Sequence, residues 1–427
     1  MNILIIYRHF WPDSPPYASM LRSIASKLVS DGHSVTVVCE QPSYKASDLD
    51  NSQPNCESID GIDVRRVAHF PMMKRFALIR QFAKIAFPFR AWWHCKRHLL
   101  CKDKYDLVWT ATIPPVVSGV VGRTLAKRYS AKFLYHCQDL YPEIAVHMGM
   151  IRKNGLLHRA LNALERRTRV DADVLISLSA DMATTSAQLA PPSGNHLVVN
   201  NFLLEDFAEE NQQPNSRNTP SAFTDTDTDT VKVIFAGNIG LFQGLEKVVR
   251  AMNNLGERGK QIELLFLGEG KALPSIKALS VDAPNIRFMP HMPYADAKNL
   301  ISQADYGLVS LEPEIYRFAY PSKTLTYLGL SVPLAVIVEP ESQLVNEITQ
   351  HDIGYHANGT DINEIESMFT SMIENRHSKG LHKANASSYY AEHCSRESVL
   401  KRWSDVIQQT NSKSPELQSQ ASTRSYP

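Results

Sequence analysis

The sequence predicts an α/β protein of two doubly wound domains, each a mainly parallel sheet with helices on both faces. Short β-branched runs alternate with amphipathic segments from the first residues, and this alternation stops once, in a polar stretch at 208–230, before it resumes. A chain of 427 residues, 43% hydrophobic and 21% charged, has the composition of a globular protein. At about 150 residues per domain, it is long enough for two or three domains.

The expected strands are compact apolar runs bounded by Gly, Asp, Pro or Ser. Helical spacing of Met20, Ile24 and Leu28 predicts a helix between the first two strands, and Gly32 ends that helix. The first domain, 1–207, has expected strands at 2–7, 34–39, 63–68, 105–110, 132–137, 173–177 and 196–200. The second, 231–395, has them at 232–236, 262–267, 286–289, 306–311, 333–338 and 353–356.

Three segments lie outside these two domains. Residues 208–230 have almost nothing apolar to bury, which predicts a linker or surface insertion. Residues 396–409 have the pattern of a final amphipathic helix, and the Gln/Ser-rich tail 410–427 is expected to be disordered.

Composition also restricts the partners and the compartment. A net charge of +1 gives no global field that would recruit nucleic acid. The six cysteines form no C-x-x-C pair, which argues against a disulfide framework or zinc knuckle. The first residues have the pattern of a strand rather than of a signal peptide, and no apolar run approaches the roughly 18 residues of a spanning helix. We therefore expect a cytoplasmic protein.

Three turns in the second half are candidates for anion binding, because ligands of open α/β sheets lie beyond the carboxyl ends of strands. They contain Gly237 and Asn238, then Gly268 and Gly270, and finally the segment 320–324 with its cationic Lys323. The alternative is that each glycine serves only a strand-to-helix turn. Neither glycine turn matches the dinucleotide or P-loop fingerprint, which disfavours a Rossmann dehydrogenase or a P-loop ATPase.

In the first half, one strand ends in a dense polar cluster. His136 is followed by Gln138, Asp139 and Glu143. The imidazole could donate a hydrogen bond or take a proton near pH 7, since its ordinary pKa is about 6.5; the alternative is a structural histidine. Two Asp-x-Asp matches, at 171–173 and 225–229, are interpreted as a helix-to-strand corner and a solvated run. The sequence therefore implies no metal.

Residues 71–104 combine cations with aromatic side chains and contain one acidic residue, Asp103. This pattern predicts a surface that contacts an anionic membrane leaflet. The alternative is a buried helix with a solvated basic face, and the lack of a broader basic stripe disfavours nucleic acid. The candidate membrane or acceptor residues here are Lys74, Arg75, Arg80, Lys84, Arg90, Trp92 and Trp93.

The order of these motifs resembles the group-1 (family 4) glycosyltransferases of GT-B fold, over nearly the whole chain up to about residue 409. It is most similar to the branch that builds bacterial O-antigen, capsule and colanic-acid-like polysaccharides, including N-acetyl-fucosamine transferases. The motifs are Asp31-Gly32-His33, the run from His136 to Glu143, the run from Gly237 to Glu246, Gly268-Glu-Gly270, and the run from Tyr320 to Tyr327.

The resemblance implies two Rossmann-like domains facing a cleft, with a nucleotide-sugar donor on the second, an acceptor on the first, and a last helix that crosses back. It also implies transfer with retained configuration and without metal or cofactor. The implied catalytic residues are His136, Lys323 and Asp139. The implied donor residues are Gly237, Asn238, Gln243, Gly268, Gly270, Glu312, Glu314, Ser322, Thr324 and Thr326, and the implied acceptor residues are Asp13, Tyr17 and Glu143.

The chain departs from the family pattern at several positions. Asn238 and Gln243 stand where many members carry Arg and Lys. Phe318 and Thr326 stand where members carry a Glu-x7-Glu pair, and Glu312 or Glu314 could replace the first of these. The segment 13–17 replaces a glycine-rich first loop.

The sequence thus predicts a transferase that moves a sugar, N-acetylated hexose or deoxyhexose, from a UDP-sugar to a polyprenyl-diphosphate-linked saccharide at the inner face of the cytoplasmic membrane. Two alternatives stay open. One is a UDP-sugar 2-epimerase of the same fold, and the other is a non-catalytic nucleotide-sugar-binding partner of a polysaccharide assembly complex.

Overall fold

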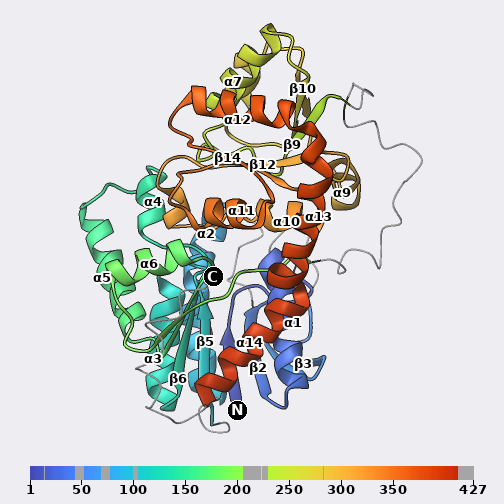
Figure 1. Cartoon of the computed structure of the whole chain (residues 1–427). Helices are drawn as coiled ribbons and strands as arrows, with labels where there is room; N and C mark the ends of the chain where they lie inside the picture. Colours follow the sequence, from blue (N-terminus) through green and yellow to red (C-terminus); the bar gives the residue numbers. More distant parts are fainter. Residues whose placement is uncertain are drawn as a thin grey trace.

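The computed structural model describes residues 1–13, 15–43, 52–68, 77–99, 104–204, 223, 229–281 and 283–411, with the backbone alone for 77–84. Two sheets with helices on both faces stand one above the other (Figure 1). The predicted fold class is therefore confirmed. The tail beyond 411 and most of the predicted linker lie outside the described residues.

All the predicted strands are present, with ends within two residues of the prediction. The first sheet contains β1 (Asn2–Ile6), β2 (Ser34–Glu40), β3 (Cys56–Ile59), β4 (Ile62–Val67), β5 (Leu107–Ala111), β6 (Lys132–Cys137), β7 (Val174–Ser177) and β8 (Asn195–Val198). The second contains β9 (Val231–Ala236), β10 (Ile262–Leu267), β11 (Ile286–Met289), β12 (Tyr306–Ser310), β13 (Leu334–Ile337) and β14 (Gly354–Ala357).

The strand orders are those of doubly wound sheets. They run β3-β4-β2-β1-β5-β6-β7-β8 and β11-β10-β9-β12-β13-β14, and among the described strands the pairs are parallel except β3 with β4. Strand β3 was not predicted. It forms a hairpin with β4 through Asp60 and Gly61, whose φ angles of 51° and 78° are those of a tight hairpin turn.

The helices form layers on both faces of each sheet. In the first domain they are α1 (Pro16–Ser30), α2 (Ala77–His94), α3 (Val117–Tyr129), α4 (Glu143–His147), α5 (Leu156–Val170) and α6 (Ala180–Leu189). In the second they are α7 (Leu245–Glu257), α8 (Leu273–Leu279), α9 (Tyr294–Ile301), α10 (Lys323–Gly329), α11 (Gln343–His351), α12 (Ile362–Glu374) and α13 (Lys379–Tyr389). Helix α3 packs between α2 and α5, so these three belong to one layer.

The last helix, α14 (Arg396–Asn411), packs on the first domain beside α1 (Figure 1). Its Trp403 is buried and stacks on Trp109 of β5, with ring centroids 4.4 Å apart. Ser404 donates a hydrogen bond to Asp31 at 2.6 Å. Because the chain returns in this way, the core of the first domain is completed by residues from the far end of the sequence.

The two domains also touch directly. The Leu140 N–H donates to the Phe318 carbonyl at 2.8 Å. Helices α6 and α11 cap each other, because the Ala180 N–H donates to the Gln343 side chain while the Gln343 N–H donates to Asp181 at 2.9 Å. Each helix start thus obtains a hydrogen-bond acceptor from the other domain.

Candidate functional site

The two glycine turns of the second domain lie side by side. They follow the neighbouring strands β9 and β10, and the Gly237 N–H donates to the Leu267 carbonyl at 2.8 Å. Gly268 has φ 139°, and a Cβ added there would stand 2.1 Å from the Gly237 carbonyl oxygen. A Cβ on Gly270 would lie 2.1 Å from the Ile239 oxygen. Backbone crowding is therefore sufficient to require glycine at 268 and 270.

The Lys323 side chain packs against the turn that contains Gly237. The Lys323 ammonium donates to the Asn238 carbonyl at 3.2 Å and lies 4.4 Å above the Phe235 ring. A Cβ on Gly237 would stand 3.4 Å from the Lys323 side chain, an ordinary van der Waals contact, so the φ angle of 110° rather than crowding favours glycine there. Burial lowers the pKa of Lys323 to about 8. The structure thus brings together two of the predicted donor residues, Gly237 and Asn238, with the predicted catalytic residue Lys323.

Two further donor candidates support the same turn. The Gln243 side chain accepts the Gly240 N–H at 2.8 Å, so it stabilises the turn from within. The Glu312 carboxylate lies beside Gly244 at the end of that turn, 3.5 Å from where a Cβ would be. Glu314, in contrast, is exposed and pairs with Arg317 at 2.7 Å.

The remaining donor candidates lie on or beside α10. Thr324 is buried, Thr326 is half-buried, and Ser322 is exposed and makes no side-chain capping bond to the helix. Phe318, at the position of the family's first Glu, is buried at the domain contact.

His136, the next-to-last residue of β6, is buried with 1% of its surface exposed. The Asn201 side-chain NH₂ donates to the Gln138 oxygen at 2.8 Å, so the Gln138 NH₂ donates to His136 Nε2, also at 2.8 Å. This assignment places the ring proton on Nδ1, which donates to the Tyr17 hydroxyl oxygen at 2.8 Å. Both ring nitrogens are therefore engaged within the first domain.

The burial of His136 fixes its charge. Its ring lies against Tyr17, Trp109 and Trp403, at centroid distances of 5.4, 6.2 and 5.0 Å. Desolvation lowers the pKa of His136 to about 3, because the charged ring would lose its water. The expectation that this imidazole takes a proton near pH 7 is wrong.

The His136 hydrogen bonds lead toward the second domain. Asn201, which holds Gln138, follows Asn200, and the Asn200 side chain lies near Tyr320 of the second domain. Tyr320 stands three residues before Lys323. The residues that hold His136 thus adjoin the segment of the second domain that carries Lys323.

Asp139 and Glu143 both follow β6. The Asp139 backbone forms a β-bridge with Ala319 of the second domain, which places it at the seam between domains. Burial raises the pKa of Asp139 to about 6. Glu143 is buried 3.5 Å from the Arg169 guanidinium.

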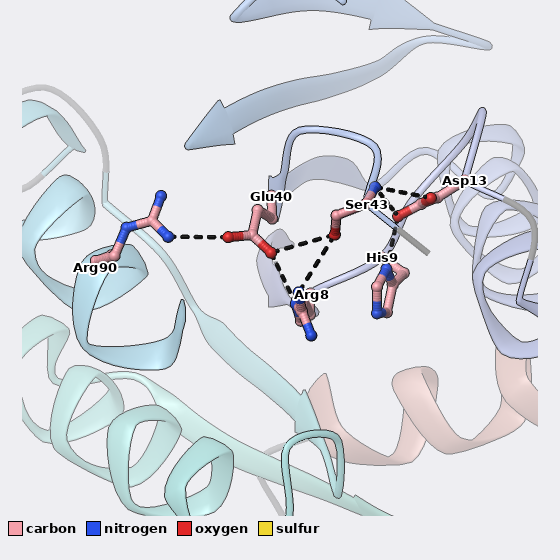
Figure 2. Close-up of polar contacts among 6 residues, drawn as sticks. All are labelled: Arg8, His9, Asp13, Glu40, Ser43 and Arg90. Carbon is pink, nitrogen blue, oxygen red and sulfur yellow. Dashed lines mark hydrogen bonds and ion pairs between the residues drawn. The ribbon is translucent and has the colours of Figure 1, made fainter. Parts of the chain in front are cut away.

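The acceptor candidate Asp13 belongs to a polar cluster beyond the ends of β1 and β2 (Figure 2). It is buried, lies 2.6 Å from the Nδ1 of His9 and accepts the Ser43 N–H at 3.1 Å. Tyr17, a second of the three acceptor candidates, contacts His136 as described above.

A second part of this cluster was not predicted. Glu40 accepts from Arg8 at 2.7 Å and from Arg90 of α2 at 2.9 Å (Figure 2). Arg8 and Glu40 could have been found from the sequence, because both stand at strand ends where ligands of such folds bind. Arg90 is therefore a paired cation, rather than one available to a membrane.

The membrane candidate 71–104 is described in part. Lys74 and Arg75 lie outside the described residues, as do the side chains of Arg80 and Lys84. Ile85, Phe89 and Trp93, four residues apart on α2, are 52%, 56% and 56% exposed. Trp92 is half-buried, with Lys96 5.2 Å from its ring. Among the described helices, none is both long and apolar enough to cross a bilayer.

Comparison with known proteins identifies relatives of the chain. The family model described as "Glycosyl transferase 4-like domain" matches residues 17–201. WbjE of Pseudomonas aeruginosa, named a probable glycosyltransferase, is 22% identical over 233 residues, 54% of this chain and 57% of that protein. WcaI of Escherichia coli, whose name places it among the glycosyl transferases of colanic acid biosynthesis, is 24% identical over 241 residues, with the same coverages of 54% and 57%. The chain thus spans somewhat more than half the length of these relatives.

Solved structures share the whole architecture. Sucrose-phosphate synthase of Thermosynechococcus elongatus superposes with a TM-score of 0.66 at 14% identity, over 96% of this chain and 98% of that one. Anabaena HepE in complex with UDP gives 0.63 at 12% identity, over 96% and 100%. The fold is therefore GT-B. The family match, the named relatives and this fold are thus all similarities to glycosyltransferases, in line with the resemblance of the motifs.

Proposed function

We propose that this protein is a glycosyltransferase of bacterial surface-polysaccharide biosynthesis. The family match and the names of WbjE and WcaI support this proposal. The transferase names do not favour the epimerase or the non-catalytic alternative. The observation that carries the proposal is the partly desolvated Lys323 ammonium held on the Gly237 turn at the carboxyl end of β9.

The proposed donor is a UDP-sugar with an N-acetylated hexose or deoxyhexose. HepE, which shares the fold, binds UDP. In the proposed site the diphosphate lies beside Lys323 and the Gly237 turn. As the sugar–phosphate bond breaks, negative charge grows on the leaving UDP, and a cation already fixed in a poorly hydrated site stabilises that charge without reorganising.

The first-domain residues have different proposed roles. His136 stays neutral and positions Tyr17 and Gln138 through its two hydrogen bonds. Asp139 has a pKa of about 6 and lies at the domain seam, so it is the proposed group for exchanging a proton with the acceptor hydroxyl. We propose transfer with retained configuration and with no resident metal or cofactor, as the family resemblance implies.

The proposed acceptor is a saccharide on polyprenyl diphosphate at the inner face of the cytoplasmic membrane. The exposed Ile85, Phe89 and Trp93 form one apolar stripe on α2. Lys96 and Arg97 are exposed at the end of this stripe. Apolar side chains beside cations fit the interface of an anionic bilayer, where such an acceptor is anchored.

The test is a panel of radiolabelled UDP-sugars with a short synthetic lipid-diphosphate acceptor. We expect transfer of sugar from one UDP-sugar of the panel. If the configuration is retained, an α-linked donor gives an α-linked product, which NMR shows. If no metal is needed, EDTA leaves the rate unchanged. Lys323→Met should abolish most turnover, while Lys298→Met, which removes a lysine lying over the Tyr294 ring on α9, should not. Epimer formation without acceptor, or UDP binding without transfer, would contradict the proposal.

A further inference from the structure

Helix α5 has its polar residues inside and its apolar residues outside. Its buried residues are Glu165, Thr168 and Arg169. Leu156, Leu157 and Leu164 are 87%, 58% and 38% exposed, and Met150, just before the helix, is 71% exposed. A surface helix ordinarily turns its apolar stripe toward the core. Helix α5 therefore presents an apolar stripe that nothing in the described structure covers.

The inward polar residues fix this orientation. The Tyr135 hydroxyl donates to Glu165 at 2.9 Å, and Glu165 lies 3.4 Å from the Arg169 guanidinium. Arg169 also donates to the Tyr141 carbonyl at 2.6 Å and lies 3.5 Å from Glu143. Rotating α5 to bury its leucines would carry Glu165 and Arg169 away together, and the buried Glu143 and Tyr135 hydroxyl would lose these partners, which is unfavourable. The leucines are thus held toward the outside.

The outer face of α5 is also cationic. Leu157, Ala160 and Leu164 recur at spacings of three and four, which places them on one side of the helix. Arg159 and Arg166, seven residues apart, are exposed at the opposite edge of the outer face, and the exposed Arg167 lies beside the stripe itself, three residues after Leu164. The segment 148–167 contains five cationic residues besides His158, and its one carboxylate, Glu165, points inward.

We propose that the outer face of α5 is a second membrane-binding surface, which lays its leucines on an anionic bilayer while its arginines contact the headgroups. The cations select an anionic partner, and the aliphatic stripe has no aromatic platform for nucleic-acid bases. Helix α3 lies between α2 and α5 in the same layer and adds the exposed Arg128. The inference adds a second surface to the membrane contact proposed for α2. It rests on the proposed function, because a membrane-anchored acceptor is the reason for the protein to bind a bilayer.

The test measures binding of the full chain to vesicles of phosphatidylglycerol and phosphatidylcholine, and to vesicles of phosphatidylcholine alone. We expect Arg159→Glu/Arg166→Glu and Leu157→Ser/Leu164→Ser each to weaken binding to the anionic vesicles at least tenfold. All four side chains lie at least partly outside, so thermal unfolding should change little. The matched control is Leu381→Ser/Lys383→Glu, which changes two exposed residues on α13 of the second domain. That control should bind as the unaltered chain does.

Three results would overturn the inference. One is wild-type vesicle binding by both α5 double variants, with binding lost on Phe89→Ser/Trp93→Ser in α2. Another is equal binding to neutral and anionic vesicles. The third is no vesicle binding together with a dimer, seen by light scattering, that the α5 leucine variant dissociates. UDP binding is measured on the same samples. If the unaltered chain does not bind UDP, the proposed donor is wrong, while the vesicle result still decides the proposal for α5.

Discussion

The affinity for UDP should fall as the pH rises, because Lys323 loses its charge near pH 8. Burial lowers the pKa of this ammonium to about 8 in the free protein. A diphosphate beside it favours the charged form, so the pKa of Lys323 rises in the complex. Above pH 8, Lys323 must therefore take up a proton when UDP binds, and the free-energy cost of this uptake grows as the pH rises. Below pH 8 the lysine is already charged and the affinity should be flat.

The size of the effect follows from the two protonation states. With a free pKa of about 8 and a bound pKa well above 9, the charged fraction falls from about 90% at pH 7 to about 10% at pH 9. The dissociation constant should therefore rise about tenfold over this range, or about 1.4 kcal/mol. The terminal phosphate of UDP contributes little, because the second ionisation of such a phosphate lies near pH 6.

Titration calorimetry at pH 7, 8 and 9 measures this change, and two buffers of different ionisation enthalpy reveal the proton uptake. Lys323→Arg should bind with a flat pH profile, since a guanidinium stays charged throughout. Lys323→Met should bind weakly, also with a flat profile. Lys298→Met should reproduce the profile of the unaltered chain. An unchanged affinity between pH 7 and pH 9 in the unaltered protein would refute the placement of the diphosphate beside Lys323.

Four further changes test the fold and the site. Lys323→Met should stabilise the ligand-free protein by about 2–3 kcal/mol below pH 8, where the buried charge is costly, and this gain should vanish between pH 8 and about 10.5, as urea unfolding would show. Trp403→Ala should cost about 3–5 kcal/mol, because it empties a buried site against Trp109; a loss below about 1 kcal/mol would mean that α14 is not docked. Gly268→Ala should cost about 1–3 kcal/mol and weaken UDP binding, because its Cβ would displace the Gly237 turn. Gln343→Ala removes a cap worth about 1 kcal/mol between the domains and should enlarge the radius of gyration in solution scattering; an unchanged radius would show that this contact does not hold the domains together.

The inner strands β5, β7, β10 and β12 could be predicted because each is a short apolar run buried on both faces of a parallel sheet, which leaves an unambiguous signal. Strand β3 carries no such signal, since its pattern alternates and every residue is at least partly exposed. Asp60-Gly61 was nevertheless a readable hairpin signal between it and β4. The prediction failed there because the chain departs from strictly alternating strands and helices at that one place.

The second-domain turn could be predicted because its parts follow neighbouring parallel strands, which end at the same sheet edge. Gly237 and Lys323 are distant in the sequence, yet both lie at the carboxyl-end edge of the second sheet, Gly237 after β9 and Lys323 after the neighbouring strand β12. The network of Arg8, Glu40 and Arg90 could not be foreseen in the same way. Arg90 comes from a helix, and whether its guanidinium pairs with the buried Glu40 carboxylate or stays in solvent depends on how α2 packs.

The state of His136 shows why a motif alone does not define a chemical role. The motif places an imidazole at a strand end, but its pKa depends on Tyr17 from α1 and on Trp403, which arrives from α14 at the far end of the chain. These rings exclude water and leave the imidazole neutral, so it can orient neighbours but cannot supply a proton. Its hydrogen bonds continue through Gln138 to Asn201, and the adjoining Asn200 lies near Tyr320 of the other domain. The docking of α14 therefore helps to set the charge of His136, because it brings Trp403 against the imidazole ring.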